Sequence, residues 1–163
     1  MSNTAGTGRS DASGVRLFPP SIYAGGLVVG YIVQWLAPIP IVPGALGIAA
    51  RILGVAVLLA GLALMFSALT MFRAVGTPVN PTEPTKALAL TGPYRFTRNP
   101  MYLGMALLLA GFALIGNALW PLLSLIPVVW IIRTQVIARE EIYLEAKFGA
   151  PYRDFKGRVR RWL

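Results

Sequence analysis

Long apolar segments, almost free of charge, alternate along this chain with short polar or proline-rich segments. At about 1.5 Å of rise per residue, four of these segments are long enough to cross or nearly cross a bilayer as helices. The four predicted spans cover residues 21–37, 46–72, 101–116 and 119–137. Residues 138–163 have a helical pattern and then a basic end, and we expect them to form a cytoplasmic C-terminal segment. The predicted fold is therefore all-α, an integral membrane helical bundle.

The N-terminal residues have a different composition. Residues 1–20 are dominated by small and polar side chains and are predicted to form a disordered tail. No cleavage site of a signal peptide is evident after the first apolar segment. With 163 residues there is room for one core, so residues 21–163 are expected to be a single membrane domain.

Glycines recur at helical spacing in the first two predicted spans. Gly47, Gly54 and Gly61 are seven residues apart, which places them on one helix face and predicts close packing against a neighbouring helix. Gly26 and Gly30 form a GxxxG pair. This pair indicates either a second close helix contact or a chance occurrence in a glycine-rich helix.

Residues 73–100 interrupt the apolar pattern with a long proline-rich loop. Loops of this length are uncommon in compact domains unless they have a function. We interpret this loop as functional, the alternative being a plain connector. Its prolines are Pro78, Pro81, Pro84, Pro93 and Pro100.

Composition narrows the classes of function. Only 13% of residues are charged and the mean hydropathy is +0.64, as expected of a membrane protein. The net charge of +9 comes from basic residues that flank apolar spans, which favours membrane lipids rather than nucleic acid as partners. The chain has no cysteine and no histidine, so thiol chemistry and imidazole bases are excluded, and no metal site is expected.

The distribution of lysine and arginine predicts the orientation. These residues concentrate in the N-terminal tail, in the proline-rich loop and in the segment from residue 133 onward. The turn between the first two predicted spans has only Arg51, and the turn between the last two has none. Cytoplasmic loops carry such an excess. We therefore expect a multi-pass protein of the inner cell membrane with both termini in the cytoplasm. The loop and the C-terminal helix would then meet on one side.

The end of the loop contains the first candidate site. Asn99 and Pro100 are typical of a helix start, with Asn at the capping position and Pro at the first helical position. Helix starts favour anionic groups, and Arg98 adds a fork of donors. Tyr102 adds a ring and a hydroxyl one turn later. Taken alone, these residues are also compatible with ordinary anchoring at the membrane interface.

The second candidate site is a pair of carboxylates, Glu140 and Glu141, at the membrane edge. Ionisable groups near the hydrocarbon are costly and mark functional sites. Arg133 lies seven residues before Glu140, on nearly the same helix face, and these two are the candidate catalytic residues. The alternative is a solvated helix end. The basic, aromatic segment 153–163 is interpreted as an interface anchor or as a cover for the site.

Together the motifs G-P-Y-x-x-x-R-N-P-M-Y-x-G, E-E-x-x-L and F-G-x-x-Y resemble the isoprenylcysteine carboxyl methyltransferase family and its phospholipid methyltransferase relatives, over about residues 76–162. Asn99 stands where eukaryotic members commonly carry His. The resemblance implies a pocket for S-adenosylmethionine built from both motifs. By position, the residues it would assign to this pocket are Tyr94, Arg98, Asn99, Pro100, Tyr102, Gly104, Glu140 and Glu141.

The chemistry of methyl transfer agrees with this resemblance. Attack is in line on an already activated carbon, so the protein mainly aligns the partners and excludes water. Neither a metal nor a thiol is needed. The ammonium and sulfonium groups of S-adenosylmethionine suit Glu140 or Glu141, and its carboxylate suits Arg98 or the helix start. For an amine or hydroxyl acceptor, Glu140 is the candidate proton acceptor.

The expected function is S-adenosylmethionine-dependent methylation of a lipophilic acceptor. An isoprenylcysteine-like carboxylate, a phospholipid and another small lipophile all remain open, as does the accepting atom, O, N or S. One alternative is a membrane-embedded NADPH-dependent reductase related to sterol reductases. Another is a small scaffold or transport subunit without enzymatic activity, although a transporter would be expected to place polar residues near the middle of the membrane.

Overall fold

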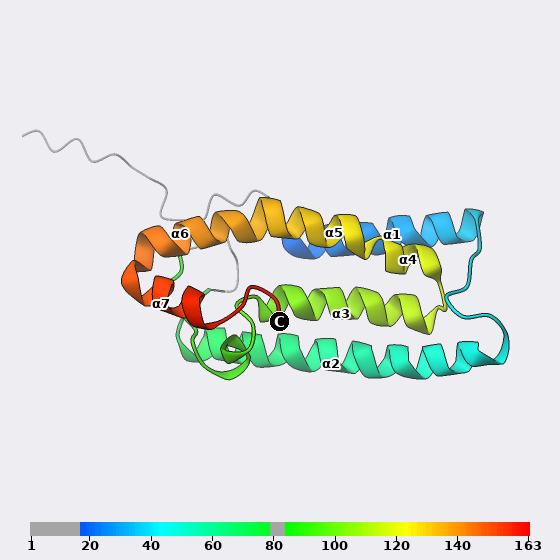
Figure 1. Cartoon of the computed structure of the whole chain (residues 1–163), viewed down its shortest axis with the longest axis horizontal. Helices are drawn as coiled ribbons and strands as arrows, with labels where there is room; N and C mark the ends of the chain where they lie inside the picture. The colour runs from blue at the N-terminus through cyan, green and yellow to red at the C-terminus, as the bar shows by residue number, and fades with distance from the viewer. Residues whose placement is uncertain (1–16, 79–83) are drawn as a thin grey trace, which may run out of the picture.

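The computed structural model describes residues 17–78 and 84–163, and their regular structure is helical (Figure 1). Apart from an isolated bridge between Pro40 and Ala118, these residues form no β-structure. The predicted all-α class is therefore confirmed for them, whereas most of the predicted N-terminal tail lies outside the described residues. The elements in chain order are α1 (Pro19–Leu36), η1 (Gly44–Leu46), α2 (Gly47–Ala74), η2 (Gly92–Arg95), α3 (Pro100–Ile115), α4 (Leu119–Leu123), α5 (Leu125–Ile131), η3 (Ile132–Ile137), α6 (Ala138–Phe148) and α7 (Ala150–Arg158).

The helices follow the predicted apolar segments closely, with one difference at the C-terminal side. α1 begins at Pro19, inside the predicted tail, because proline suits the first helical turn. The helix that contains the last predicted span continues beyond residue 137. One helical rod, made of α4, α5, η3 and α6, runs over Leu119–Phe148 (Figure 1). The two candidate carboxylates are thus part of the same rod as the apolar segment before them.

A π-helical segment, η3, lies within this rod directly before the carboxylates. π-helical turns close i→i+5 hydrogen bonds and hold more residues than α-helical turns, so they rotate the following residues around the axis. A seven-residue spacing that crosses η3 consequently does not keep two side chains on one face. Arg133 lies inside η3 and is exposed.

α2 and α3 pack closely and antiparallel, and glycines form their contact (Figure 1). A Cβ on Gly54 would lie 2.6 Å from the backbone nitrogen of Ile115, and one on Gly61 would lie 2.9 Å from the carbonyl oxygen of Gly104. At the far end, Gly47 faces the side-chain amide of Asn117. The prediction of a glycine face on this helix is confirmed.

The GxxxG pair of α1 faces the rod in the same way. A Cβ on Gly30 would lie 2.5 Å from the Cα of Pro121, and one on Gly26 would clash with the side chain of Val128. The hydroxyl of Tyr31 donates a 2.7 Å hydrogen bond to the carbonyl oxygen of Phe112. The pair therefore marks a real helix contact and not a chance occurrence.

The surface of the bundle is apolar over long stretches. Two helices, Gly44–Ala74 and Leu119–Phe148, are long and apolar enough to cross a membrane, and α3 is a shorter apolar helix. Large side chains such as Ile48, Ile52 and Phe66 on α2 are about two-thirds exposed. An exposed apolar band of this kind is typical of membrane association. The four-span topology and its orientation remain predictions.

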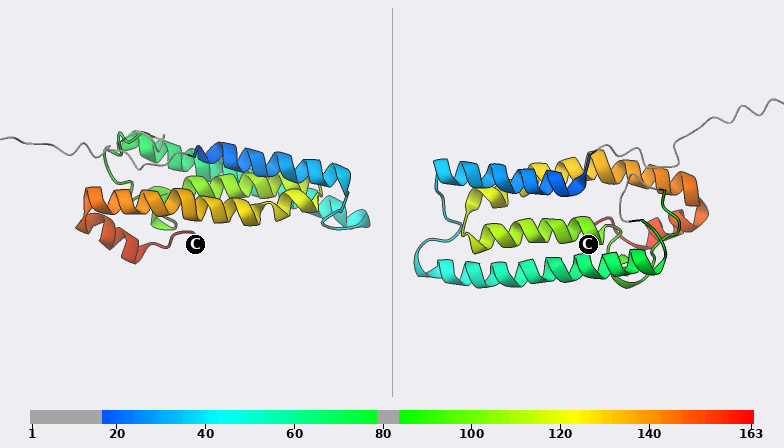
Figure 2. Two further views of the ribbon diagram at one scale, coloured as in Figure 1. Left: turned by 90° about the horizontal axis from the view of Figure 1, so that it is seen from above. Right: turned by 180° about the vertical axis from the view of Figure 1, so that it is seen from behind.

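The C-terminal segment folds back onto the helix bundle. Gly149, with φ of +59°, ends α6 and allows the sharp change of direction into α7. After α7, residues 159–163 run back toward the start of α3, where the chain end lies (Figures 1 and 2). The loop before α3, the start of α3, α6 and the C-terminal segment consequently surround one end of the bundle.

Candidate functional site

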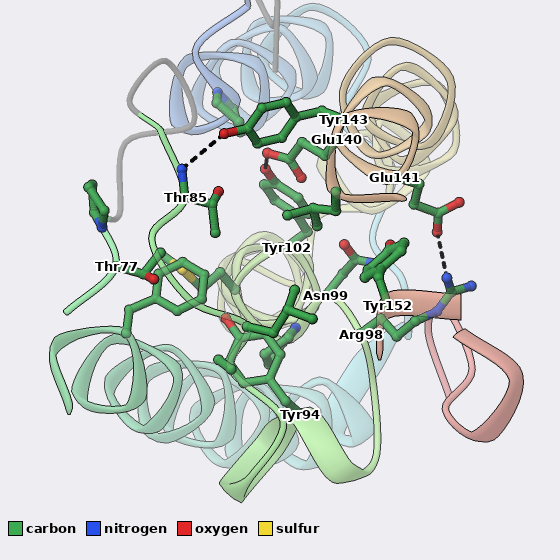
Figure 3. A pocket seen from close by; sticks show the side chains of 18 of the residues that line it. Thr77, Thr85, Tyr94, Arg98, Asn99, Tyr102, Glu140, Glu141, Tyr143 and Tyr152 are labelled. Carbon is green, nitrogen blue, oxygen red and sulfur yellow. Dashed lines mark hydrogen bonds and ion pairs between the residues drawn. The ribbon is translucent and has the colours of Figure 1, made fainter. Parts of the chain in front are cut away.

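A cavity of about 430 Å³ occupies this end of the bundle. This volume lies in the range of small-molecule sites in proteins. Its walls come from the start of α1, the end of α2, the proline-rich loop, the first turns of α3, and α6 and α7 (Figure 3). The polar or charged side chains in its lining are Thr77, Thr85, Tyr94, Arg98, Asn99, Tyr102, Glu140, Glu141, Tyr143 and Tyr152.

The loop is fastened across the cavity by polar contacts with its own residues and with α6. The buried hydroxyl of Thr77 donates to the carbonyl oxygen of Ala87 at 2.8 Å and accepts from the backbone nitrogen of Ala87 at 2.9 Å. The backbone nitrogen of Thr85 donates to the hydroxyl of Tyr143 at 3.1 Å. These bonds close the loop on itself and join it to the carboxylate-bearing helix. The loop is therefore part of the cavity wall.

α3 starts where the sequence predicted, but Asn99 does not cap it through its side chain. Pro100 is the first helical residue, and Asn99 occupies the capping position without a side-chain capping bond. Its side-chain amide instead donates to the carbonyl oxygen of Arg161 at 2.9 Å. The hydroxyl of Thr97, almost fully buried, donates to the same carbonyl at 3.2 Å. Asn99 thus joins the start of α3 to the C-terminal segment.

Glu140 faces the cavity opposite Tyr102 (Figure 3). The hydroxyl of Tyr102 donates to Oε1 of Glu140 at 2.6 Å, a short hydrogen bond to a carboxylate. Tyr102 is held in turn by Tyr23 of α1, whose hydroxyl donates to the Tyr102 carbonyl at 2.9 Å. Among residues 17–78 and 84–163, none forms an ion pair with Glu140. An ionised Glu140 would therefore be hydrogen-bonded to a neutral donor, the Tyr102 hydroxyl, and could still bind a cationic group of a ligand.

Glu141 has different surroundings, because two arginines share its carboxylate. Arg161 donates from Nε to Oε1 at 3.0 Å and from Nη2 to Oε2 at 2.6 Å. Nη1 of Arg98 lies 3.1 Å from the same Oε1. Two guanidinium groups and one carboxylate leave one net positive charge in this cluster. The carboxylate bonds raise the pKa of Arg161, and burial raises the pKa of the adjacent Tyr152 to about 12.

Arg98 retains unused hydrogen-bonding capacity. Its Nε is buried and makes no hydrogen bond to any residue that the structure describes. Unpaired buried donors are costly and are expected to find a partner. Arg98 also lines the cavity, so an anionic group of a ligand bound there would lie close to its guanidinium group.

The structure brings most of the predicted site residues together around this cavity. Those that line it are Tyr94, Arg98, Asn99, Pro100, Tyr102, Glu140 and Glu141. Gly104 is not among them. It lies at the contact with α2, where a Cβ would meet the side chain of Met65 and, at 3.0 Å, the carbonyl oxygen of Gly61. Its small size is required there by helix packing and not by a ligand.

The prediction that Arg133 lies on nearly the same helix face as Glu140 is wrong. Arg133 is exposed and does not line the cavity. The prediction assumed α-helical rotation between the two residues, whereas the intervening η3 is π-helical. The sequence of η3, three polar residues between apolar ones, does not distinguish a π-helical turn from an α-helical one.

Sequence reasoning did not find several residues of the site. Thr77, Thr85 and Tyr143 hold the loop, and Arg161 binds Glu141. Nothing distinguishes the two threonines from other loop threonines in the sequence. For the basic C-terminal tail, the sequence did suggest a cover for the site as one of two interpretations. It did not, however, identify Arg161 among the basic residues of the tail.

Comparison with known proteins gives two matches. A family model described as phospholipid methyltransferase matches residues 49–151. An uncharacterized protein from Haemophilus influenzae (strain ATCC 51907 / DSM 11121 / KW20 / Rd) is 49% identical over 65 residues, which are 39% of this chain and the whole of that protein. No solved structure matches the chain. The family match extends from the start of α2 to the start of α7 and so includes most of the cavity wall.

Proposed function

Because the chain belongs to the phospholipid methyltransferase family, we propose that it is an integral membrane enzyme that transfers a methyl group from S-adenosylmethionine to a lipophilic acceptor. The observation that carries this proposal is the pairing of opposite charges in one cavity. Glu140 provides a carboxylate without a cationic partner among the described residues, and the Arg98–Glu141–Arg161 cluster provides a net positive charge.

These charges suit the amino-acid end of S-adenosylmethionine. Its carboxylate matches the net positive charge of the Arg98–Glu141–Arg161 cluster. Its ammonium matches Glu140. Glu141 is already neutralised by two arginines, so its role is to position Arg98 and not to bind a cation itself. The two adjacent carboxylates would thus have different functions.

The apolar lining suits the rest of the reactants. Phe72, Leu88 and Leu144 line the cavity beside Tyr94, whose ring stacks on Phe72 at 5.5 Å between centroids. When bound, S-adenosylmethionine supplies a methyl group on a sulfonium, already activated for transfer. The residues around it align the partners and exclude water, which provides much of the rate in such reactions.

The acceptor is proposed to be lipophilic and to enter from the bilayer. Phe18 and Pro19 of the α1 region and Met105 of α3 contribute apolar surface to the cavity, next to helices whose outer surfaces are apolar. For an amine or hydroxyl acceptor, Glu140 is the group placed to take up a proton, with Tyr102 holding its carboxylate in position.

We also propose four spans with the cavity on the cytoplasmic side. α1 and α3 would accompany the two long apolar helices across the membrane, and basic residues concentrate at the cavity end, in the loop and after α6. Reporter fusions at the termini and in the segment 37–46, in intact cells, test this orientation. A cytoplasmic signal from 37–46 would contradict it.

Calorimetric titration of the detergent-purified protein with S-adenosylmethionine and S-adenosylhomocysteine tests the proposed cofactor. Saturable binding to one site is expected, weakened at least tenfold in Glu140→Gln because a charged contact is lost. Glu145→Gln is the matched control, since Glu145 lies on the same helix in an exposed pair with Lys156. No binding by a folded sample, together with binding of NADPH, would replace this proposal with the reductase alternative.

A further inference from the structure

Residues 159–163 make backbone and side-chain contacts with both halves of the proposed cofactor site. The carbonyl oxygen of Arg160 accepts from the backbone nitrogen of Arg98 at 3.0 Å, and that of Arg161 accepts from Thr97 and Asn99. Trp162 packs against the buried cluster that includes Tyr23. The segment is thus joined by hydrogen bonds of its backbone carbonyls to residues 97–99, directly before α3, and to α6 by the Arg161 side chain.

The Arg161 side chain binds the same carboxylate that Arg98 contacts. Arg161 takes both carboxylate oxygens of Glu141 in a forked arrangement, which is the most directional form of this ion pair. Arg98 contacts the same carboxylate through Nη1 and also forms a side-chain hydrogen bond with Tyr152. Without Arg161, Glu141 would be free to turn toward Arg98 and take up its remaining donors. The net positive charge of the cluster would also disappear.

We propose that Arg161 is a positioning residue: it holds Glu141 so that the cluster it forms with Arg98 keeps a net positive charge for the carboxylate of the methyl donor. This inference rests on the proposed function and adds a segment that lies beyond the family match, which ends at residue 151. The C-terminal segment is then part of the site and not only an anchor at the membrane interface.

A pair of ligands that differ by one carboxylate gives the test. S-adenosylmethionine and its decarboxylated form are titrated into the full-length, detergent-purified protein. We expect the wild type to bind S-adenosylmethionine about tenfold or more tightly than the decarboxylated form, as one charged contact would give. In Arg161→Gln this preference is expected to disappear, through weaker binding of S-adenosylmethionine alone. In turnover assays KM for S-adenosylmethionine should rise while kcat stays near that of the wild type.

Two further variants separate positioning from folding. Arg161→Lys keeps the charge and should restore most of the preference for the carboxylate. Arg160→Gln is the matched control, because Arg160 is exposed and the substitution retains the backbone carbonyl that contacts Arg98. It should bind both ligands as the wild type does.

The outcomes are distinct. If Arg161→Gln keeps the wild-type preference, or weakens both ligands equally, Arg161 does not act through Arg98 on the carboxylate and the inference is overturned. If the folded wild type binds neither ligand, the proposed function fails and this inference fails with it. Unfolding midpoints in detergent, measured on the same samples, show whether a variant is misfolded. If Arg161→Gln is misfolded, the comparison of ligand preference between Arg161→Lys and Arg160→Gln tests the inference instead.

Discussion

The hydroxyl of Tyr102, at the start of α3, donates a 2.6 Å hydrogen bond to the carboxylate of Glu140 on α6. This bond joins the two sequence motifs across the cavity. It also gives Glu140 a neutral partner, whereas the adjacent Glu141 is shared by two arginines. Two consecutive carboxylates on one helix therefore have different electrostatic surroundings, one neutral and one positively charged, and this difference is the basis of the roles proposed for them.

Replacing Tyr102 by Phe should weaken methyl-donor binding without unfolding the protein. The ring and its packing remain, but Glu140 loses its only hydrogen bond to the described residues and its orientation is no longer fixed. We expect KM for S-adenosylmethionine to rise about tenfold, since a hydrogen bond to a charged group contributes about 1.5–3 kcal/mol. Steady-state kinetics measure the change. Tyr31→Phe is the control, because that hydroxyl bonds Phe112 at the other end of the bundle; an equal effect in both variants would contradict a specific role for Tyr102.

Replacing Gly54 by Ala should destabilise the α2–α3 contact. The added Cβ would lie 2.6 Å from the backbone nitrogen of Ile115 and 2.9 Å from the carbonyl oxygen of Gly111, and backbone atoms cannot rotate away. We expect a loss of about 1–3 kcal/mol, typical of overpacking, seen as a lower unfolding midpoint in detergent. Gly25→Ala serves for comparison, since nothing lies within 4 Å of its added Cβ. A midpoint that fell equally in both would show that helix packing is not the cause.

Replacing Thr77 by Val should loosen the proline-rich loop. The variant keeps the shape of the side chain but leaves the backbone N–H and C=O of Ala87 without their partner, at a cost of about 1–3 kcal/mol for each buried group left unpaired. Hydrogen exchange of residues 84–90 should become faster, and the affinity for S-adenosylhomocysteine should fall. Thr70→Val, which removes an exposed bond within α2, should change neither quantity. Unchanged exchange in Thr77→Val would mean that the loop is held by other contacts.

Tyr152 should make stability sensitive to alkaline pH. Burial raises its pKa from 10.0 to about 12, so the folded state favours the protonated phenol more than the unfolded state does. This contribution is complete below pH 10 and is lost as the pH rises toward 12. Unfolding measured from pH 8 to pH 12 should therefore show a steeper loss of stability in the wild type than in Tyr152→Phe. Parallel curves for the two proteins would contradict the raised pKa.

Most of the helices could be predicted from the sequence, because apolar segments of this length have few stable alternatives in a membrane. The glycines of α1 and α2 also identified the helix faces in contact, since only small residues allow backbones to approach so closely. The main error was the assumed relation of Arg133 to Glu140. It arose because the prediction assumed α-helical rotation throughout, whereas the segment η3 between the two residues is π-helical.

The sequence by itself determined the all-α class, the glycine contacts, the family resemblance and seven of the predicted residues that line the cavity. These features depend on local periodicity and on motifs of adjacent residues, which a single chain displays directly. Only the tertiary structure decided that Gly104 serves packing, that Glu140 and Glu141 differ in their partners, and that Arg161 reaches the site. Those facts depend on which residues meet after the chain has turned back at Gly149, and such meetings between distant segments leave no periodic signal in the sequence.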